Sequence, residues 1–153
     1  LHISQGEAKA LREQYFERFG GVQTYLHESV EKARSLGYTE TLLGRRRYLP
    51  ELTSDNRQRR ENAERVALNS PIQGTAADII KLAMLRVDHG LQKAEAASRL
   101  VLQVHDELIV DVAPGELDLV SEIVREGMEG AYELAVPMDV SVGVGQTWLE
   151  AAH

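Results

Sequence analysis

A long apolar run that is interrupted at its centre by three ionisable residues constrains the fold more than any other feature. The run extends from Leu100 to Val112, with His105, Asp106 and Glu107 between two stretches rich in aliphatic and β-branched side chains. Such stretches are typical of β-strands. Because charged side chains are rarely buried without partners, the run is expected to fold back on itself. The triplet is then predicted at the turn of a β-hairpin.

The triplet has a chemical and a structural interpretation. Two adjacent carboxylates, Asp106 and Glu107, repel each other, and a divalent cation would offset that repulsion. Mg²⁺ binds one or two protein carboxylates together with substrate phosphates, and phosphoryl-transfer sites use such carboxylates to hold two ions. The alternative is a plain exposed turn, since Asp is a common turn residue. His105 alone is more often a structural, hydrogen-bonded histidine than a metal ligand. The spacing leaves both interpretations open.

Capping and turn signals divide the rest of the chain into helices and short strands. Ser4 to Glu7 has the capping-box pattern, Gly20-Gly21 is expected to break the first helix, and Ser70-Pro71 predicts a new helix start. The predicted helices cover residues 4–19, 22–36 (followed by Gly37), 56–68, 70–91 and 116–128; a loop is expected over 92–97, and strands over 38–41, 47–49, in two pieces within 99–112, and over 138–144. Helices first and then strand–strand–helix–strand indicate an α+β fold, with helices packed on an antiparallel sheet.

Composition excludes several classes of protein. The 153 residues include no cysteine, which rules out disulfides, thiolate metal sites and cysteine catalysis. The length suits one domain of about 100–200 residues. The sequence contains neither a signal peptide nor an apolar run of about 18 residues, so no membrane contact and a cytoplasmic location are expected. Because residue 1 is Leu rather than Met, the chain is expected to be part of a longer protein.

The net charge of −7 argues against a nucleic-acid-binding protein, but it averages two different regions. Residues 45–60 carry six arginines against two acids, a net +4, whereas residues 104–153 carry one arginine against eleven acids, a net −10. Arginine binds phosphate oxygens in bidentate geometry, so the basic block is a candidate phosphate contact; a solvated loop is the alternative. Most acids of the last third, such as Glu116, Glu122 and Glu126, are expected to be solvated surface.

Three polar residues, Arg65, Asn69 and Gln73, would share one face of an unbroken helix because they are spaced at i, i+4 and i+8. Their side chains can contact sugar oxygens and minor-groove acceptors of nucleic acids. The structural alternative is that Ser70 and Gln73 form a capping box and that Asn69 bonds the helix end.

In this order, the motifs resemble the end of the polymerase domain in the bacterial DNA polymerase I family, the family A DNA polymerases. The resemblance covers essentially the whole chain. It rests on Gly44 to Pro50, on Ala63 to Lys81, on Gln103-Val-His-Asp-Glu107, and on the ending from Trp148 to His153.

The resemblance implies a fragment of a right-hand polymerase, with the end of the fingers and a hairpin in residues 1–55 and the palm in residues 56–153. It implies that Asp106 and, with a lesser role, its acidic neighbour Glu107 are catalytic carboxylates that bind Mg²⁺, with two ions in the complete protein. It also implies that His105 lies near the primer terminus. The implied contacts to primer and template come from Arg65, Asn69, Gln73, Gln103, Arg45, Arg46 and Arg47. Deoxynucleoside triphosphates and a DNA primer–template are the implied partners, and the bacterial nucleoid is the implied location.

The motif with the second metal-binding Asp and the nucleotide-binding helix of the family are absent from the sequence, so both are expected in missing upstream segments. The first hypothesis is therefore a DNA-directed DNA polymerase whose isolated fragment is inactive. The second is a non-catalytic module that binds primer–template duplex. A metal-dependent nuclease is a third, less favoured interpretation, because nothing here supplies a second metal-binding cluster.

Overall fold

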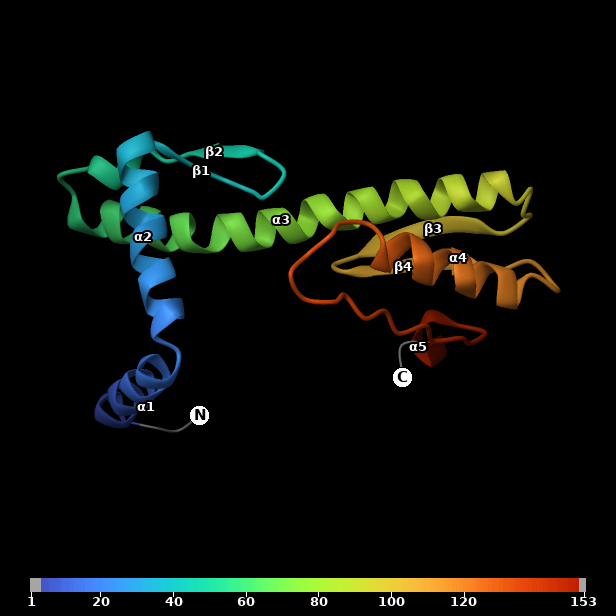
Figure 1. The fold of residues 1–153 in the computed structure, drawn as a ribbon, viewed down its shortest axis with the longest axis horizontal. Helices are drawn as coiled ribbons and strands as arrows, with labels where there is room; N and C mark the ends of the chain where they lie inside the picture. Colours follow the sequence, from blue (N-terminus) through green and yellow to red (C-terminus); the bar gives the residue numbers. More distant parts are fainter. Residues whose placement is uncertain (1–3, 152–153) are drawn as a thin grey trace. The chain divides into compact units, whose positions relative to one another are not determined.

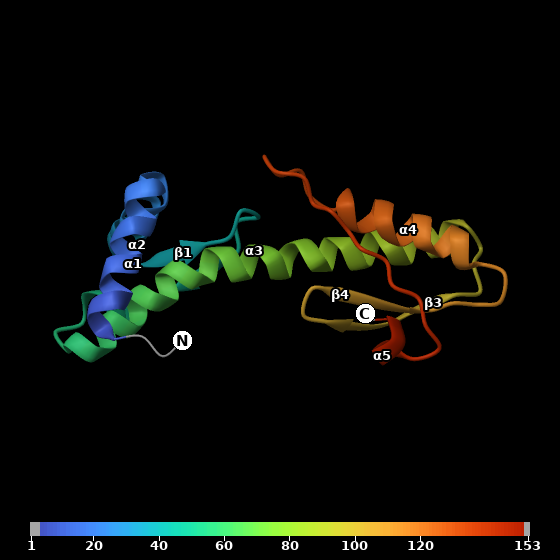
Figure 2. The same ribbon diagram turned by 90° about the horizontal axis from the view of Figure 1, so that it is seen from below.

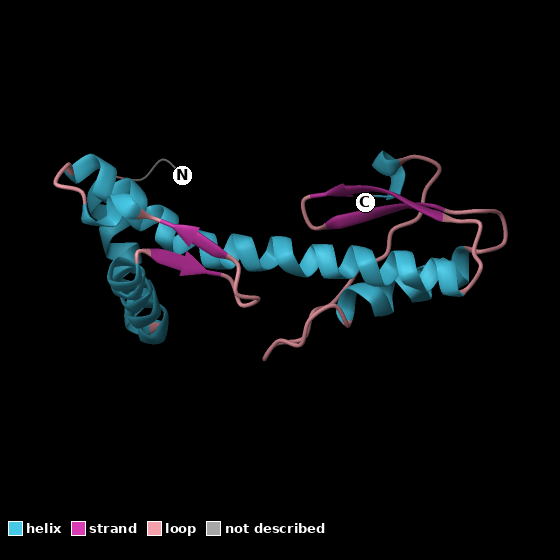
Figure 3. Ribbon diagram, turned by 90° about the horizontal axis from the view of Figure 1, so that it is seen from above, coloured by secondary structure: helices cyan, strands magenta, loops and turns pink. Residues whose placement is uncertain are grey.

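The computed structural model describes residues 4–151, which form helices and two short antiparallel hairpins (Figure 1). In chain order the elements are α1 (Gln5–Arg18), α2 (Gly20–Leu36), β1 (Tyr38–Glu40), β2 (Arg46–Tyr48), the 3-10 helix η1 (Pro50–Thr53), α3 (Arg57–Lys93), β3 (Arg99–Val104), β4 (Glu107–Asp111), α4 (Leu117–Glu129) and α5 (Trp148–Ala151). Strand β1 pairs with β2, and β3 pairs with β4 (Figure 3). The predicted α+β class is confirmed. The chain divides into two compact units, one up to Thr75 and one from Ala76 onward. No helix in the described part of the chain is both long and apolar enough to cross a lipid bilayer.

The first helix begins at the predicted capping box. Ser4 Oγ accepts from the Glu7 backbone N–H at 3.3 Å, and the Glu7 carboxylate accepts from the Ser4 N–H at 2.8 Å. The predicted break between two helices is confirmed, but it lies at Phe19, one residue before Gly20-Gly21. The Phe19 ring packs against Tyr15 with centroids 5.0 Å apart, and both glycines then fit into the first turn of α2.

The β1–β2 hairpin follows α2 through a glycine turn. Gly37 has φ +76°, the left-handed conformation that glycine adopts without strain, and its N–H donates to the Ala33 carbonyl. Tyr38 pairs with Tyr48 across the two strands. The adjoining core of the first unit consists of Ala33, Leu49, Leu52, Ala63 and Ala67.

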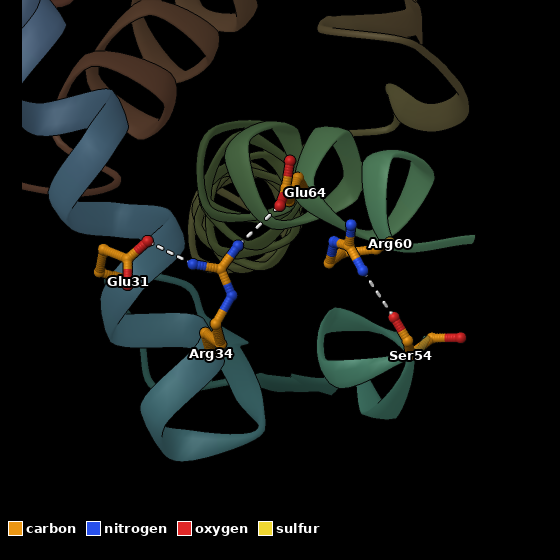
Figure 4. A network of polar contacts seen from close by, with 5 residues as sticks. All are labelled: Glu31, Arg34, Ser54, Arg60 and Glu64. Atoms are coloured by element: carbon orange, nitrogen blue, oxygen red, sulfur yellow. Dashed lines mark hydrogen bonds and ion pairs between the residues drawn. The ribbon is translucent and has the colours of Figure 1, made fainter. Parts of the chain in front are cut away.

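Polar contacts add to this core (Figure 4). Arg34 of α2 donates to the Glu64 carboxylate of α3 at 2.6 Å and also to Glu31. Arg60 donates to the Ser54 carbonyl at 2.9 Å, so the end of η1 is attached to the first turns of α3.

Helix α3 continues through the predicted start at Ser70-Pro71, so that prediction is wrong. Pro71 lacks an N–H and cannot bond the Ala67 carbonyl, which usually interrupts a helix. Here Ala67 is fully buried, and arginine side chains of the hairpin region donate to the helix on either side of the proline, at Ser70 and at Gly74. Tertiary packing thus outweighs the local signal. The helix also continues to Lys93, into the predicted 92–97 loop.

The second unit is built from the end of α3, the β3–β4 hairpin and α4 (Figure 2). Its core combines Val87 and Leu91 of α3 with Val120 and Val124 of α4, and Leu108 and Val110 of β4 pack against them. Glu116, expected as solvated surface, instead binds the loop before β3. Its carboxylate accepts from the Ala97 and Ser98 N–H groups at 3.0 Å and from the Ser98 hydroxyl at 2.6 Å, and these bonds lower its pKa.

The strand predicted over 138–144 is wrong, because the backbone there is irregular. The Val140 N–H donates to the Glu129 carboxylate rather than to a neighbouring strand. Further along, a β-carbon at Gly143 would lie 1.8 Å from the Ala151 carbonyl oxygen. A residue other than glycine at position 143 would therefore clash with the end of α5.

Candidate functional site

The turn between β3 and β4 presents the predicted catalytic triplet. Val104 pairs with Glu107, so the predicted turn consists of His105 and Asp106, while Glu107 is the first residue of β4. His105 has φ +53°, a left-handed conformation that is uncommon for residues other than glycine but that histidine adopts more often than most. The Gln103 side-chain amide donates to the His105 carbonyl and thereby supports the turn. All four of these polar residues, including Asp106, are exposed.

Glu107 has a hydrogen-bond partner from a distant part of the sequence. The indole Nε1 of Trp148 donates to Glu107 Oε2 at 3.3 Å. The sequence alone indicates Trp148 only as part of an ending that resembles the family. The sequence does contain a signal for a helix start beside Trp148, because Thr147 to Glu150 has the same Ser/Thr-x-x-Glu capping-box pattern that predicted the start of α1.

The carboxylate pair supplies part of a metal site. Among residues 4–151, no group of three or more His, Asp or Glu side chains could enclose a metal ion. Mg²⁺ needs only one or two protein carboxylates when water and phosphate oxygens complete its coordination. The exposed Asp106 and Glu107 carboxylates fit that limited role. Binding of two Mg²⁺ ions stays a prediction.

The residues predicted to contact nucleic acid on α3 lie on one continuous helix. Arg65, Asn69 and Gln73 are all exposed, and their i, i+4, i+8 spacing is uninterrupted because α3 does not end at Pro71. The capping-box alternative for Gln73 is wrong, since Ser70 lies inside the helix and its hydroxyl accepts from Arg47 at 3.3 Å. This shared placement is compatible with contact to a single extended ligand.

The arginines of the hairpin region are exposed and also have structural partners. Arg45 donates to the Gly74 carbonyl at 3.0 Å, and Arg47 donates to Ser70. Arg46 lies 4.5 Å from the centroid of the Tyr38 ring and 3.4 Å from the Glu40 carboxylate. The structure thus brings Arg45 and Arg47 alongside the segment of α3 that carries Gln73. His105, Asp106, Glu107 and Gln103 belong to the second unit.

This combination of fold and motifs defines a polymerase class. The family model for DNA polymerase family A matches residues 1–150, and the chain belongs to that family.

Several relatives with this sequence pattern are named DNA polymerase I. The chain is 61% identical over 153 residues to the protein from Mycobacterium bovis and 62% identical over 153 residues to that from Mycobacterium leprae, covering 100% of this chain and 17% of each relative. It is 46% identical over 151 residues to the thermostable DNA polymerase I of Thermus aquaticus, covering 99% of this chain and 18% of that protein.

A solved structure also matches. It is the POL domain of Pol1 from M. smegmatis in complex with DNA primer–template and dNTP. The TM-score is 0.96 at 60% identity, and the match covers 99% of this chain and 27% of that chain. The chain therefore spans less than a third of the proteins it resembles.

Proposed function

We propose that this chain forms part of the active site of a DNA-directed DNA polymerase, which adds deoxynucleotides to a primer 3′ end during DNA replication and repair. The observation that carries the proposal is the exposed Asp106 at the tip of the β3–β4 turn. It lies in a chain with 60% identity to a polymerase domain whose structure contains primer–template DNA and dNTP.

In the proposed reaction, the primer 3′-hydroxyl attacks the α-phosphate of a deoxynucleoside triphosphate. A new phosphorus–oxygen bond forms, the bond to the bridging oxygen breaks, and pyrophosphate leaves. Such transfers depend mainly on positioning and on stabilisation of charge. Two Mg²⁺ ions, held by Asp106, Glu107 and a carboxylate outside this chain, would supply Lewis-acid stabilisation of the phosphate oxygens.

The remaining predicted residues would bind DNA. We assign Arg65, Asn69, Gln73 and Gln103 to contacts along primer and template, and His105 to the primer terminus. Arg45, Arg46 and Arg47 are assigned to the template backbone. In this assignment residues 1–55 belong to the end of the fingers and residues 56–153 to the palm.

Substitution of Asp106 in the intact polymerase tests the proposal. Asp106→Ala should reduce primer extension by at least about 100-fold, because a charge-stabilising group is lost, while affinity for primer–template stays within a few-fold. Asp139→Ala is a matched control, since Asp139 is an exposed acid outside the turn. Normal extension by the Asp106→Ala enzyme would refute the assignment.

A non-catalytic duplex-binding module is the second candidate. The exposed row of Arg65, Asn69 and Gln73 on the continuous helix α3 favours it, because these side chains can contact nucleic acid without a metal ion. In this case the 153-residue chain binds primer–template with an affinity that falls steeply with salt, because arginines replace counterions on the phosphates. Template-dependent extension by the purified chain would exclude this candidate.

A further inference from the structure

Trp148 connects the last described helix to the candidate active site. It is the one tryptophan of the chain, and it lies 41 residues beyond Glu107 in the sequence. Its indole N–H donates to the Glu107 carboxylate at 3.3 Å, while about half of the side chain remains exposed. Hydrogen bonds to ionised acceptors are stronger than those between neutral groups.

The segment around Trp148 has a defined local structure. Thr147 caps α5, with its hydroxyl accepting from the Glu150 N–H at 3.3 Å. The Glu150 carboxylate in turn accepts from the Gln146 N–H at 2.8 Å. A β-carbon at Gly145 would lie 2.8 Å from the Ala151 nitrogen, so the glycine permits this close return of the chain.

Glu107 needs such a partner because its neighbour has the same charge. Asp106 and Glu107 are consecutive and exposed, and each can adopt several rotamers in water. A donor bound to one oxygen of Glu107 limits its orientations and offsets part of its negative charge. The two carboxylates then differ in their freedom of orientation. Asp106 lies at the tip of the turn, and Glu107 is restrained by its hydrogen bond to the indole.

We propose that Trp148 is a positioning residue for the polymerase reaction and acts through the Glu107 carboxylate. This inference rests on the proposed function for its kinetic consequence. The contact itself can be tested without catalysis.

The contact is tested by ¹⁹F NMR of the intact polymerase labelled with 5-fluorotryptophan. Trp148→Phe assigns the Trp148 resonance by its loss. Glu107→Ala should shift this resonance because the indole loses its acceptor. Asp106→Ala removes an equal charge one residue away and should shift it much less. A Trp148 resonance that is unmoved by Glu107→Ala, or moved equally by both variants, overturns the proposal.

The functional role is tested by a double-mutant cycle in the same protein. Trp148→Phe keeps an aromatic ring but removes the donor, so the apparent kcat for extension should fall by about 3- to 10-fold, the range expected for the net loss of one ordinary, exposed hydrogen bond. In the Glu107→Ala background, Trp148→Phe should have no further effect. Leu149→Ala, at the neighbouring exposed position of α5, should leave kcat unchanged in both backgrounds.

An equal loss in both backgrounds, accompanied by a lower melting temperature, would show a purely structural role and overturn the proposal. The two proposals fail separately. Normal extension by Asp106→Ala would refute the polymerase assignment even if the fluorine resonance responds to Glu107. A Trp148 resonance that does not respond to Glu107 would refute the positioning role even if Asp106 is essential.

Discussion

Gly127 allows α4 to approach α3 more closely than any other residue would. A β-carbon at Gly127 would lie 2.8 Å from Val87 Cγ2 and 3.3 Å from the Val87 backbone nitrogen. Val87 is completely buried, and its backbone belongs to a continuous helix. Neither atom can move away without a shift in the packing of the two helices. Gly127→Ala is therefore expected to destabilise the second unit.

The magnitude follows from two opposing terms. Overpacking a dense core by one methyl group costs about 1–3 kcal/mol. Replacing glycine by alanine within a helix stabilises the helix by up to about 1 kcal/mol. Gly21→Ala in α2 is a matched control, because a β-carbon there meets nothing within 4 Å and Gly21 also lies in a terminal helical turn. The stability difference between the two variants should therefore be about 1–3 kcal/mol, the overpacking term.

Urea denaturation followed by far-ultraviolet circular dichroism measures this difference. Gly127→Ala should lower the free energy of unfolding relative to Gly21→Ala. The Gly127→Ala/Val87→Ala double variant should lose less unfolding free energy than the two single variants lose together, because Val87→Ala removes the methyl group that clashes with the new β-carbon. If Gly127→Ala is as stable as Gly21→Ala, the close approach of the helices at this point is refuted.

Two further predictions concern polar contacts. The pKa of Glu116 is lowered by its bonds to Ser98 and Ala97, so its stabilisation is complete above the ordinary value of about 4.5 and is lost as the pH falls through the lower folded value. Glu116→Gln should therefore destabilise the chain at pH 7 but progressively less below pH 4.5, as urea titrations at several pH values would show; a pH-independent difference would contradict this. The Arg34 and Glu64 side chains are each 33% exposed. A double-mutant cycle with Arg34→Met and Glu64→Gln should give a coupling free energy of about 0.5–1 kcal/mol that decreases in 1 M salt. A coupling free energy that does not change with salt would count against an ion pair.

Local signals predicted the parts of the fold whose determinants lie close together in sequence. The Ser4–Glu7 capping box spans four residues, and the left-handed Gly37 directly follows α2. The β3–β4 turn was predictable because charged residues interrupt an apolar run. Placing Asp106 at a turn needed no knowledge of tertiary contacts.

Tertiary contacts explain the predictions that were wrong. The local sequence at Pro71 predicts a helix start. The Arg47 and Arg45 side chains, more than 20 residues away, donate hydrogen bonds to α3 on either side of the proline. Ala97 and Ser98, whose N–H groups donate to Glu116, precede it by 19 and 18 residues. No local pattern encodes these pairings, and so neither the continuous α3 nor the role of Glu116 could be predicted.

Net charge is a weak guide to function here because it counts every ionised group equally. Arg45 and Arg47 contribute to the basic block, yet both also attach the hairpin region to α3. Glu116 contributes to the acidic last third, yet backbone and hydroxyl donors bind it. Asp106 differs in being exposed at the tip of a turn whose backbone has a left-handed residue. Position and exposure, rather than the sum of charges, therefore separate the carboxylate proposed to bind a metal ion from one that stabilises the fold.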